Sequence, residues 1–305
     1  MRHVLTLFDL TSAEIEEISE ITEDLKTKLA QGVREPLFPG RVLALLFEKQ
    51  SLRTRVSFET AMAHLGGNSL FLGKDVGWGE RESAADFGQV LGEYVDAVVC
   101  RANSHAKVEA LAEHCNRPVI NGLTDTSHPC QALADLYTLR ELHGSLTGLR
   151  LAYVGDANNV ARSLAIACGK LGVEFAVAAP DGYQFDTEFL TELEKKLPTM
   201  SLVQTTDPHE AVAGAVAVYT DVWASMGQEG EREERARALA GYQVNSGLMK
   251  QAASEACFLH CLPARRGEEV TAEVIDGPRS AIVQEAGNRL HAQKGLLAWL
   301  LRSTG

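Results

Sequence analysis

The sequence lacks the long apolar runs of membrane proteins and the basic clusters of nucleic-acid-binding proteins. No stretch approaches the roughly 18 to 20 apolar residues that a membrane span needs. The 41 acidic side chains outnumber the 29 basic ones, which gives a formal net charge of -12, and no run of Lys and Arg is long enough to follow a phosphate backbone. Asp9 interrupts the N-terminal segment where a secretory signal would stay apolar. We therefore expect a cytoplasmic protein that binds neither membranes nor nucleic acid.

Two nucleotide-binding signatures are also missing. The sequence contains no Gly-x-Gly-x-x-Gly fingerprint and no Gly-rich P-loop, which argues against a dinucleotide-dependent oxidoreductase. The 6 cysteines are irregularly spaced in mostly apolar segments, as reduced, buried thiols are in a cytosolic enzyme. The segment Cys257-Phe-Leu-His-Cys261 could hold a metal, but in a strand its two cysteines would share one face while His260 points away. We expect no metal and no cofactor.

The order of apolar patterns indicates the fold class. At 305 residues the chain exceeds the size of a single core, so two domains are expected. Short apolar runs such as Val42 to Phe47 alternate with helical patterns such as Leu52 to Leu65. Crossovers of this length join parallel strands covered by helices on both faces. The turn-rich stretch Gly144 to Gly148 interrupts the alternation, which then restarts. The prediction is an α/β chain of two domains, each a mainly parallel sheet covered by helices.

The segment Ser51-Leu-Arg-Thr-Arg55 has the components of a phosphate site. It follows an apolar strand and opens a helix, where unpaired backbone N–H groups meet anions. Its two hydroxyls and two guanidiniums supply donors for a dianion, and one Arg could bind in bidentate fashion. The alternative interpretation is a helix cap with surface arginines.

Three further segments carry candidate chemistry. His128-Pro-Cys-Gln131 opens a helix, where an imidazole can donate to a developing oxyanion, although a polar loop histidine is an equal alternative. The run Val154 to Asn159 ends a strand and begins a helix, which suits a carboxylate. The run Asp221 to Gly227 follows a strand and leads into a charged stretch typical of a lid. A strand predicted at Ser280 to Val283 precedes a helix, Gly287 to Leu301, that could pack on either domain.

Taken together, these motifs resemble the aspartate and ornithine carbamoyltransferase family. The resemblance covers essentially the full chain and rests on Ser51-Leu-Arg-Thr-Arg55, His128-Pro-Cys-Gln131 and His260-Cys-Leu-Pro263. The residues that look like the ornithine branch are Asp221, the run Ser225-Met226-Gly227, Asn159 and Cys261.

The resemblance implies a role for each matching position. The residues expected to bind carbamoyl phosphate are Ser51, Leu52, Arg53, Thr54, Arg101, His128, Gln131, Cys261, Leu262 and Arg289. Those expected to bind ornithine are Asn159, Asp221, Ser225 and Met226. Those expected to act in catalysis are Arg101, His128, Asp221 and Cys261. Pro263 resembles the cis-proline of the family.

The resemblance also implies an organisation and a setting. Residues 1–142 would bind carbamoyl phosphate and residues 143–285 ornithine, while residues 286–305 would form a helix that returns to the first domain. A homotrimer, or a multiple of trimers, is the expected assembly. Arginine biosynthesis is the expected role, with arginine breakdown as the alternative.

The implied activity is transfer of the carbamoyl group from carbamoyl phosphate to the side-chain amine of L-ornithine, giving L-citrulline and phosphate. The alternative acceptors are an N-acylated ornithine and putrescine. Gly77 stands where ornithine enzymes often have Gln, and some relatives acting on N-acylated ornithine use a tryptophan in this loop, where the chain has Trp78. A non-catalytic relative is a second alternative, but Arg53, Arg101, His128 and Cys261 are all retained.

Overall fold

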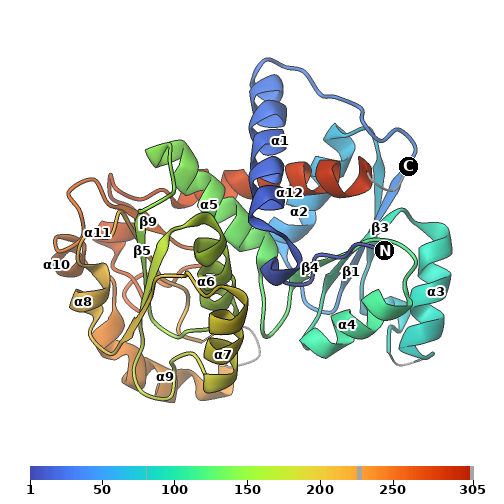
Figure 1. Cartoon of the computed structure of the whole chain (residues 1–305). Coiled ribbons are helices and arrows are strands. Elements are labelled where there is room, and N and C mark those ends of the chain that lie inside the picture. Colours follow the sequence, from blue (N-terminus) through green and yellow to red (C-terminus); the bar gives the residue numbers. More distant parts are fainter. Residues whose placement is uncertain (80, 225–228, 303–305) are drawn as a thin grey trace. The chain divides into compact units, whose positions relative to one another are not determined.

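The chain forms two compact units, described here from a computed structural model (Figure 1). The structure describes residues 1–79, 81–224 and 229–302. Unit 1 comprises Met1–Ala134 and Gly287–Gly305, and unit 2 comprises Asp135–Ala286. The division falls inside helix α5, Pro129–His143. The boundary predicted between residues 142 and 143 lies at the end of the same helix and stays a prediction.

Unit 1 is built on a parallel sheet. Its strands are β1 (Val42–Phe47), β2 (Asn68–Leu72), β3 (Ala97–Arg101) and β4 (Val119–Leu123), in the order β2-β1-β3-β4. Its helices are η1 (Leu7–Asp9), α1 (Ser12–Ala30), α2 (Leu52–His64), η2 (Lys74–Val76), α3 (Ala84–Tyr94) and α4 (His105–His114). The predicted α/β class and parallel strands are confirmed for this unit.

Helices cover this sheet because its central strands are apolar on both faces. Ala44, Leu46 and Val98 pack with apolar residues of α3 and α4, such as Leu91 and Leu111. The alternate residues of the same strands, which point to the opposite face, are also buried. The continuous apolar run of β1 therefore marks a strand buried on both faces.

The C-terminal helix α12, Ile282–Arg302, packs on helix α1 of the first unit. The Nζ atom of Lys294 donates to the carbonyl of Leu25 at 3.0 Å, and Trp299 Nε1 donates to Glu17 at 2.7 Å. A side chain at Gly295 would place its Cβ 2.1 Å from Thr22 Oγ1, so only glycine permits this approach. The predicted return of the C-terminal helix to the first domain is confirmed.

The strand predicted at Ser280 to Val283 is wrong. Ser280 forms a single bridge with Phe258, and the helix already begins at Ile282. Val283 is exposed on that first turn. The short run of β-branched residues favours a strand locally, but the helix that follows extends back over it.

Unit 2 repeats the architecture with a second parallel sheet. Its strands are β5 (Arg150–Val154), β6 (Glu174–Ala178), β7 (Leu202–Thr205), β8 (Ala217–Tyr219) and β9 (Cys257–Leu259), in the order β7-β6-β5-β8-β9. Its helices are α6 (Asn159–Leu171), α7 (Thr187–Lys196), α8 (Pro208–Val212), η3 (Glu229–Glu231), α9 (Arg232–Leu239), η4 (Ala240–Tyr242), α10 (Ser246–Met249) and α11 (Ala272–Ile275). The predicted class is confirmed here too.

Sheet order decides which loops can form a site. In unit 1, β1 and β3 are neighbours, so the loops that follow Phe47 and Arg101 leave the sheet at the same edge. In unit 2, β5, β8 and β9 are neighbours, which brings together the loops after Val154, Tyr219 and Leu259. None of the described helices is both long enough and apolar enough to cross a membrane.

Candidate functional site

Ser51 ends the loop after β1 and caps helix α2. Its backbone is extended, and its hydroxyl accepts a hydrogen bond from the backbone N–H of Thr54 at 3.3 Å. The side chain of Leu52 is 77% exposed, so this residue can offer a ligand only its backbone. Because the first N–H groups of a helix have no intrahelical partner, the turn from Ser51 to Thr54 presents donors to an anion.

Thr54 joins two arginines that come from distant parts of unit 1. Its Oγ1 accepts from Arg101 at the end of β3 and from Arg289 on α12, each at 3.2 Å. Arg289 also donates to the amide oxygen of Gln131, near the start of α5, at 2.6 Å. All four side chains are buried. The structure thus brings together four of the residues predicted to bind carbamoyl phosphate.

The charge of Arg289 is not neutralised by a carboxylate within the described residues. Its hydrogen-bond partners are the neutral oxygens of Thr54 and Gln131. The side-chain amide of Gln293 can be oriented so that its nitrogen donates and its oxygen accepts. In that orientation the oxygen also accepts from Arg289 Nε at 3.2 Å. A guanidinium only 2% exposed and without a carboxylate is costly unless an anion binds it. The cluster is therefore suited to a phosphate dianion.

Arg53 and Arg55, both on α2, differ in their surroundings. Arg53 is half-buried, and its charge acts on the buried His128. Arg55 is more exposed, pairs with Glu59 one turn later at 2.9 Å, and lies over the ring of Phe71. The alternative of a surface arginine thus applies to Arg55, whereas Arg53 contributes to the buried cluster.

His128 is a neutral imidazole beside this positive cluster. It is buried at the start of α5, where its carbonyl accepts the N–H groups of Gln131 and Ala132. Burial, followed by the charges of Arg289, Arg101 and Arg53, holds the pKa of His128 well below its usual value of 6.5. A neutral ring can still donate one hydrogen bond to a carbonyl oxygen, so His128 can polarise a carbonyl at neutral pH.

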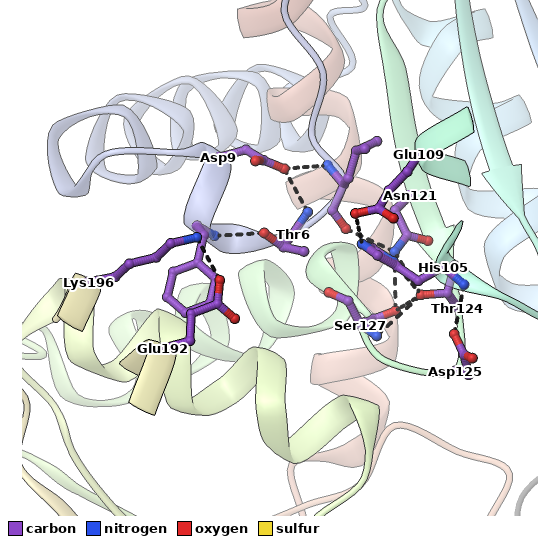
Figure 2. A network of polar contacts seen from close by, with 12 residues as sticks. Thr6, Asp9, His105, Glu109, Asn121, Thr124, Asp125, Ser127, Glu192 and Lys196 are labelled. Atoms are coloured by element: carbon purple, nitrogen blue, oxygen red, sulfur yellow. Dashed lines mark hydrogen bonds and ion pairs between the residues drawn. The ribbon is translucent and has the colours of Figure 1, made fainter. Parts of the chain in front are cut away.

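A polar network holds the loop that carries His128 (Figure 2). The amide of Asn121 donates to the carbonyl of Leu5 at 2.9 Å and to the hydroxyl of Thr124 at 3.2 Å. Thr124 N–H donates to the carbonyl of Ser127 at 2.9 Å, and its hydroxyl lies 2.9 Å from His105 Nδ1. Asn121, Thr124, Ser127 and His105 were not among the predicted site residues. Their side chains orient the backbone that enters α5.

Asp221 and Cys261 meet in unit 2, at the ends of β8 and β9. The Cys261 thiol donates to Asp221 Oδ1 at 3.1 Å, and the backbone N–H of Val222 donates to the same oxygen at 2.8 Å. Burial and the adjacent carboxylate of Asp221 raise the pKa of the Cys261 thiol well above its usual value. The thiol therefore stays protonated at neutral pH and is a poor nucleophile.

Asn158, which sequence reasoning passed over, contacts Asp221 directly. Its side-chain oxygen caps α6 by accepting from the N–H groups of Val160 and Ala161. Its Nδ2 atom donates to Asp221 Oδ2 at 2.9 Å. The predicted residue Asn159 is half-buried in the first turn of the same helix. The preference of Asn for the N-cap position was the signal that could have identified Asn158.

Leu262 follows Cys261 in an unusual conformation. Its φ is +57°, in the left-handed region that non-glycine residues rarely adopt, and its bond to Pro263 is cis, as predicted. The backbone N–H of Leu262 donates to Nδ1 of His260 at 2.9 Å. Because that nitrogen accepts, the ring proton lies on Nε2, which is 3.3 Å from the buried carboxylate of Glu269.

From strand alternation we predicted that His260 points away from the face shared by Cys257 and Cys261. This prediction is wrong, because β9 ends at Leu259 and strand alternation does not continue to Cys261. Ligand atoms of Asp221, His260 and Cys261 lie within 4.8 Å of one another, a group that could hold a metal ion. Both ring nitrogens of His260 already face hydrogen-bond partners, so a metal would have to displace one of them. The predicted site residues Ser225 and Met226 lie outside the described residues.

Comparisons with known proteins converge on one family. Residues 2–141 match the model for "Aspartate/ornithine carbamoyltransferase, carbamoyl-P binding domain", and residues 147–300 match "Aspartate/ornithine carbamoyltransferase, Asp/Orn binding domain". An ornithine carbamoyltransferase of Anoxybacillus flavithermus is 53% identical over 97% of this chain and 96% of its own length.

Solved structures agree with the sequence relatives. The ornithine carbamoyltransferase of Pyrococcus furiosus superposes with a TM-score of 0.95 at 48% identity, covering 99% of this chain and 97% of that one. The anabolic ornithine carbamoyltransferase of Campylobacter jejuni superposes with a TM-score of 0.93 at 34% identity, covering 100% of both chains.

Proposed function

The chain belongs to the aspartate/ornithine carbamoyltransferase family, and we propose that it transfers the carbamoyl group of carbamoyl phosphate to the side-chain amine of L-ornithine, giving L-citrulline and phosphate. The relatives that match it over almost their whole length are named for this reaction. Carbamoyl phosphate is assigned to residues 1–142 with 286–305, and ornithine to residues 143–285.

The observation that carries this proposal is the buried cluster around Thr54. Arg289 and Arg101 supply positive charge for a phosphate, and neutral His128 supplies a donor for the adjoining carbonyl. A ligand that combines a phosphate dianion with a carbonyl group matches these donors. Ser51, Leu52 and Arg53 complete the phosphate site at the start of α2, and Gln131 orients Arg289.

The reaction requires a neutral amine at the carbamoyl carbon. The free alkylammonium has a pKa near 10, so the site must bind the amine in its uncharged form. We assign Asp221, Cys261 and Leu262 to the orientation of that nitrogen. Nitrogen attack forms the C–N bond, the C–O bond to phosphate breaks with its electron pair on oxygen, and the proton that the nitrogen loses passes to the departing phosphate. Arg101 and His128 stabilise the charge that develops on the carbonyl oxygen.

Free L-ornithine is the proposed acceptor rather than an N-acylated ornithine or putrescine. The environment of Trp78 favours it, because the ring is 8% exposed and packs with Phe87 in the core of its own unit. A tryptophan engaged in that core has little surface left to recognise an acyl group. Asn159, Ser225 and Met226 complete the proposed ornithine site with Asp221.

The test is to measure citrulline or its analogue formed from ornithine, N-acetylornithine, N-succinylornithine and putrescine at saturating carbamoyl phosphate. Ornithine should have the highest catalytic efficiency, because putrescine leaves the polar groups that bind the α-carbon substituents unpaired, which costs about 1–3 kcal/mol per group. A higher efficiency with any other acceptor would refute the substrate assignment and leave the family assignment standing.

A homotrimer, or a multiple of trimers, is the proposed assembly. Strand β2 is an edge strand with exposed apolar side chains at Leu70 and Phe71, and α2, which packs against it, exposes Leu52 and Val56. An apolar edge of this kind favours association with another chain, which supports the proposed assembly. Light scattering should give three times the 33.0 kDa chain mass or a multiple of that, and Val56→Glu with Leu70→Glu should dissociate the assembly. A monomeric parent protein would refute the proposal.

The proposed setting is arginine biosynthesis in the cytoplasm. The 6 cysteines of the chain are all free, as expected where thiols stay reduced. The Campylobacter jejuni relative described as anabolic supports the biosynthetic direction. Complementation of an arginine auxotroph that lacks its own ornithine carbamoyltransferase tests the role.

A further inference from the structure

Arg235, on helix α9, is a buried arginine that neither the motifs nor the proposed mechanism include. Its guanidinium donates to the carboxylate of Asp156 and to the backbone carbonyl of Trp223. The group also lies over the ring of Tyr183, 5.0 Å from its centroid. Its side chain is only 8% exposed and that of Asp156 19%, so this pair is shielded from solvent. Burial raises the pKa of Asp156, and the charge of Arg235 opposes that effect.

Arg235 also pairs with Glu231 one turn earlier at 3.5 Å, but the Glu231 side chain is 60% exposed. The two groups that accept hydrogen bonds from Arg235 belong to the loops that carry the candidate ornithine site. Asp156 lies in the loop between β5 and α6, and its carbonyl accepts the N–H of Asn158 at 2.7 Å. Trp223 lies two residues after Asp221 in the loop that follows β8. One guanidinium therefore contacts both loops.

Asn158 and Asp221 form a second connection between the same two loops. The amide of Asn158 donates to Asp221 at 2.9 Å, so the loops are joined once through Arg235 and once through these two side chains. The two loops are therefore connected at two points, and all of these contacts lie within the described part of unit 2. Movement of either loop would strain both connections, which makes the position of the Asp221 carboxylate depend on Arg235.

A second ion pair of α9 provides a contrast. Arg232 pairs with Glu268, but the side chains are 51% and 30% exposed. An exposed pair of this kind adds little to stability. The burial of Arg235 and its hydrogen bonds to two loops therefore distinguish it from Arg232 on the same helix.

We propose that Arg235 is a positioning residue for the acceptor amine, because it fixes the relative placement of the loops that carry Asp221 and Asn158. This inference rests on the proposed ornithine site and adds a residue to its support. Loss of Arg235 should weaken ornithine binding and amine orientation, while carbamoyl phosphate binding, assigned to the other unit, should be retained.

The experiment compares full-length Arg235→Met, Arg235→Lys, Asp156→Asn and the double variant Arg235→Met/Asp156→Asn with the parent, using Arg232→Met as the matched control. The KM for ornithine should rise about 10- to 100-fold in Arg235→Met and in Asp156→Asn, while the KM for carbamoyl phosphate stays within about threefold. The double variant should be no worse than Arg235→Met, because Arg235→Met already removes the contact that Asp156→Asn breaks. Arg235→Lys should restore part of the loss, and Arg232→Met should be unchanged.

Circular dichroism and thermal unfolding check that each variant is folded. A folded Arg235→Met with reduced thermal stability but an unchanged KM for ornithine would show a structural anchor only and would overturn the proposal. Equal rises in both KM values would overturn it as well. If Arg235→Met does not fold, the proposal is tested with the isosteric Asp156→Asn variant, using the same comparison of the KM values for ornithine and carbamoyl phosphate. Failure of the parent protein to carbamoylate ornithine is a different result, which refutes the proposed function itself.

Discussion

Thr54 and Arg289 lie 235 positions apart in the sequence, yet the guanidinium of Arg289 donates to the hydroxyl of Thr54 over 3.2 Å. The same hydroxyl accepts from Arg101. A single buried oxygen therefore connects residues from α2, β3 and α12. This contact links the C-terminal helix to the start of α2, where the proposed phosphate site lies.

Replacing Thr54 with Val should weaken carbamoyl phosphate binding. Valine keeps the shape but removes the acceptor shared by the two arginines, and an unpaired buried group costs about 1–3 kcal/mol. The KM for carbamoyl phosphate should rise about 5- to 150-fold, measured by initial rates at saturating ornithine. Thr54→Ser keeps the hydroxyl and is the control. A folded Thr54→Val with the parent KM would contradict the role of this contact.

The start of α2, which carries the proposed phosphate site, was predictable because its residues are contiguous. A strand, a capping Ser and a run of donors form a local pattern, and the structure places Ser51, Arg53 and Thr54 at the start of α2 as that pattern indicates. The contact between Thr54 and Arg289 could not be found in this way. Spacing along the chain does not say where a helix 235 positions away returns, and only the family resemblance suggested it.

Unit 2 shows where local patterns stop being informative. Two consecutive asparagines follow Asp156 and Ala157, and whether Asn158 or Asn159 caps the helix depends on which one leaves helical geometry. Arg235 lies in a charged segment beside Arg232 and Arg237, and no sequence pattern separates the buried arginine from its exposed neighbour Arg232. Such distinctions arise from tertiary packing, because the loops that bind Arg235 come from distant positions.

Arg53→Ala should lower catalytic efficiency by about 30- to 1000-fold, since a phosphate would lose a charge-assisted donor worth about 2–4 kcal/mol. The neighbouring Arg55→Ala removes the same group from a surface position, and its efficiency should stay within about threefold of the parent. Citrulline formation at subsaturating carbamoyl phosphate measures both variants. If Arg53→Ala kept the parent activity, the phosphate site would have to lie elsewhere.

Cys261→Ser should retain measurable turnover. The thiol is held protonated by burial and by the carboxylate of Asp221, so we expect it to orient the amine and not to form a covalent intermediate. A serine hydroxyl can donate to Asp221 in the same way, and kcat should fall by no more than about 100-fold. Mass spectrometry of the parent quenched during turnover should show an unmodified Cys261. A carbamoylated thiol, together with an inactive Cys261→Ser, would reverse this assignment.

His128 should make the folded protein less stable in mild acid. Its pKa is lowered in the folded state by burial and three arginines, whereas in the unfolded chain it is near 6.5. Below about pH 6.5 the unfolded chain binds a proton that the folded chain does not, so the free energy of unfolding falls as the pH falls.

Urea unfolding at about pH 7.5 and about pH 5.5 should show a smaller loss of unfolding free energy in His128→Gln than in the parent. The exposed His209 provides the control, since His209→Gln should keep the full loss. Equal losses in the parent and in His128→Gln would mean that burial and the three arginines do not lower the pKa of His128 in the folded protein, which would contradict the environment described for this ring.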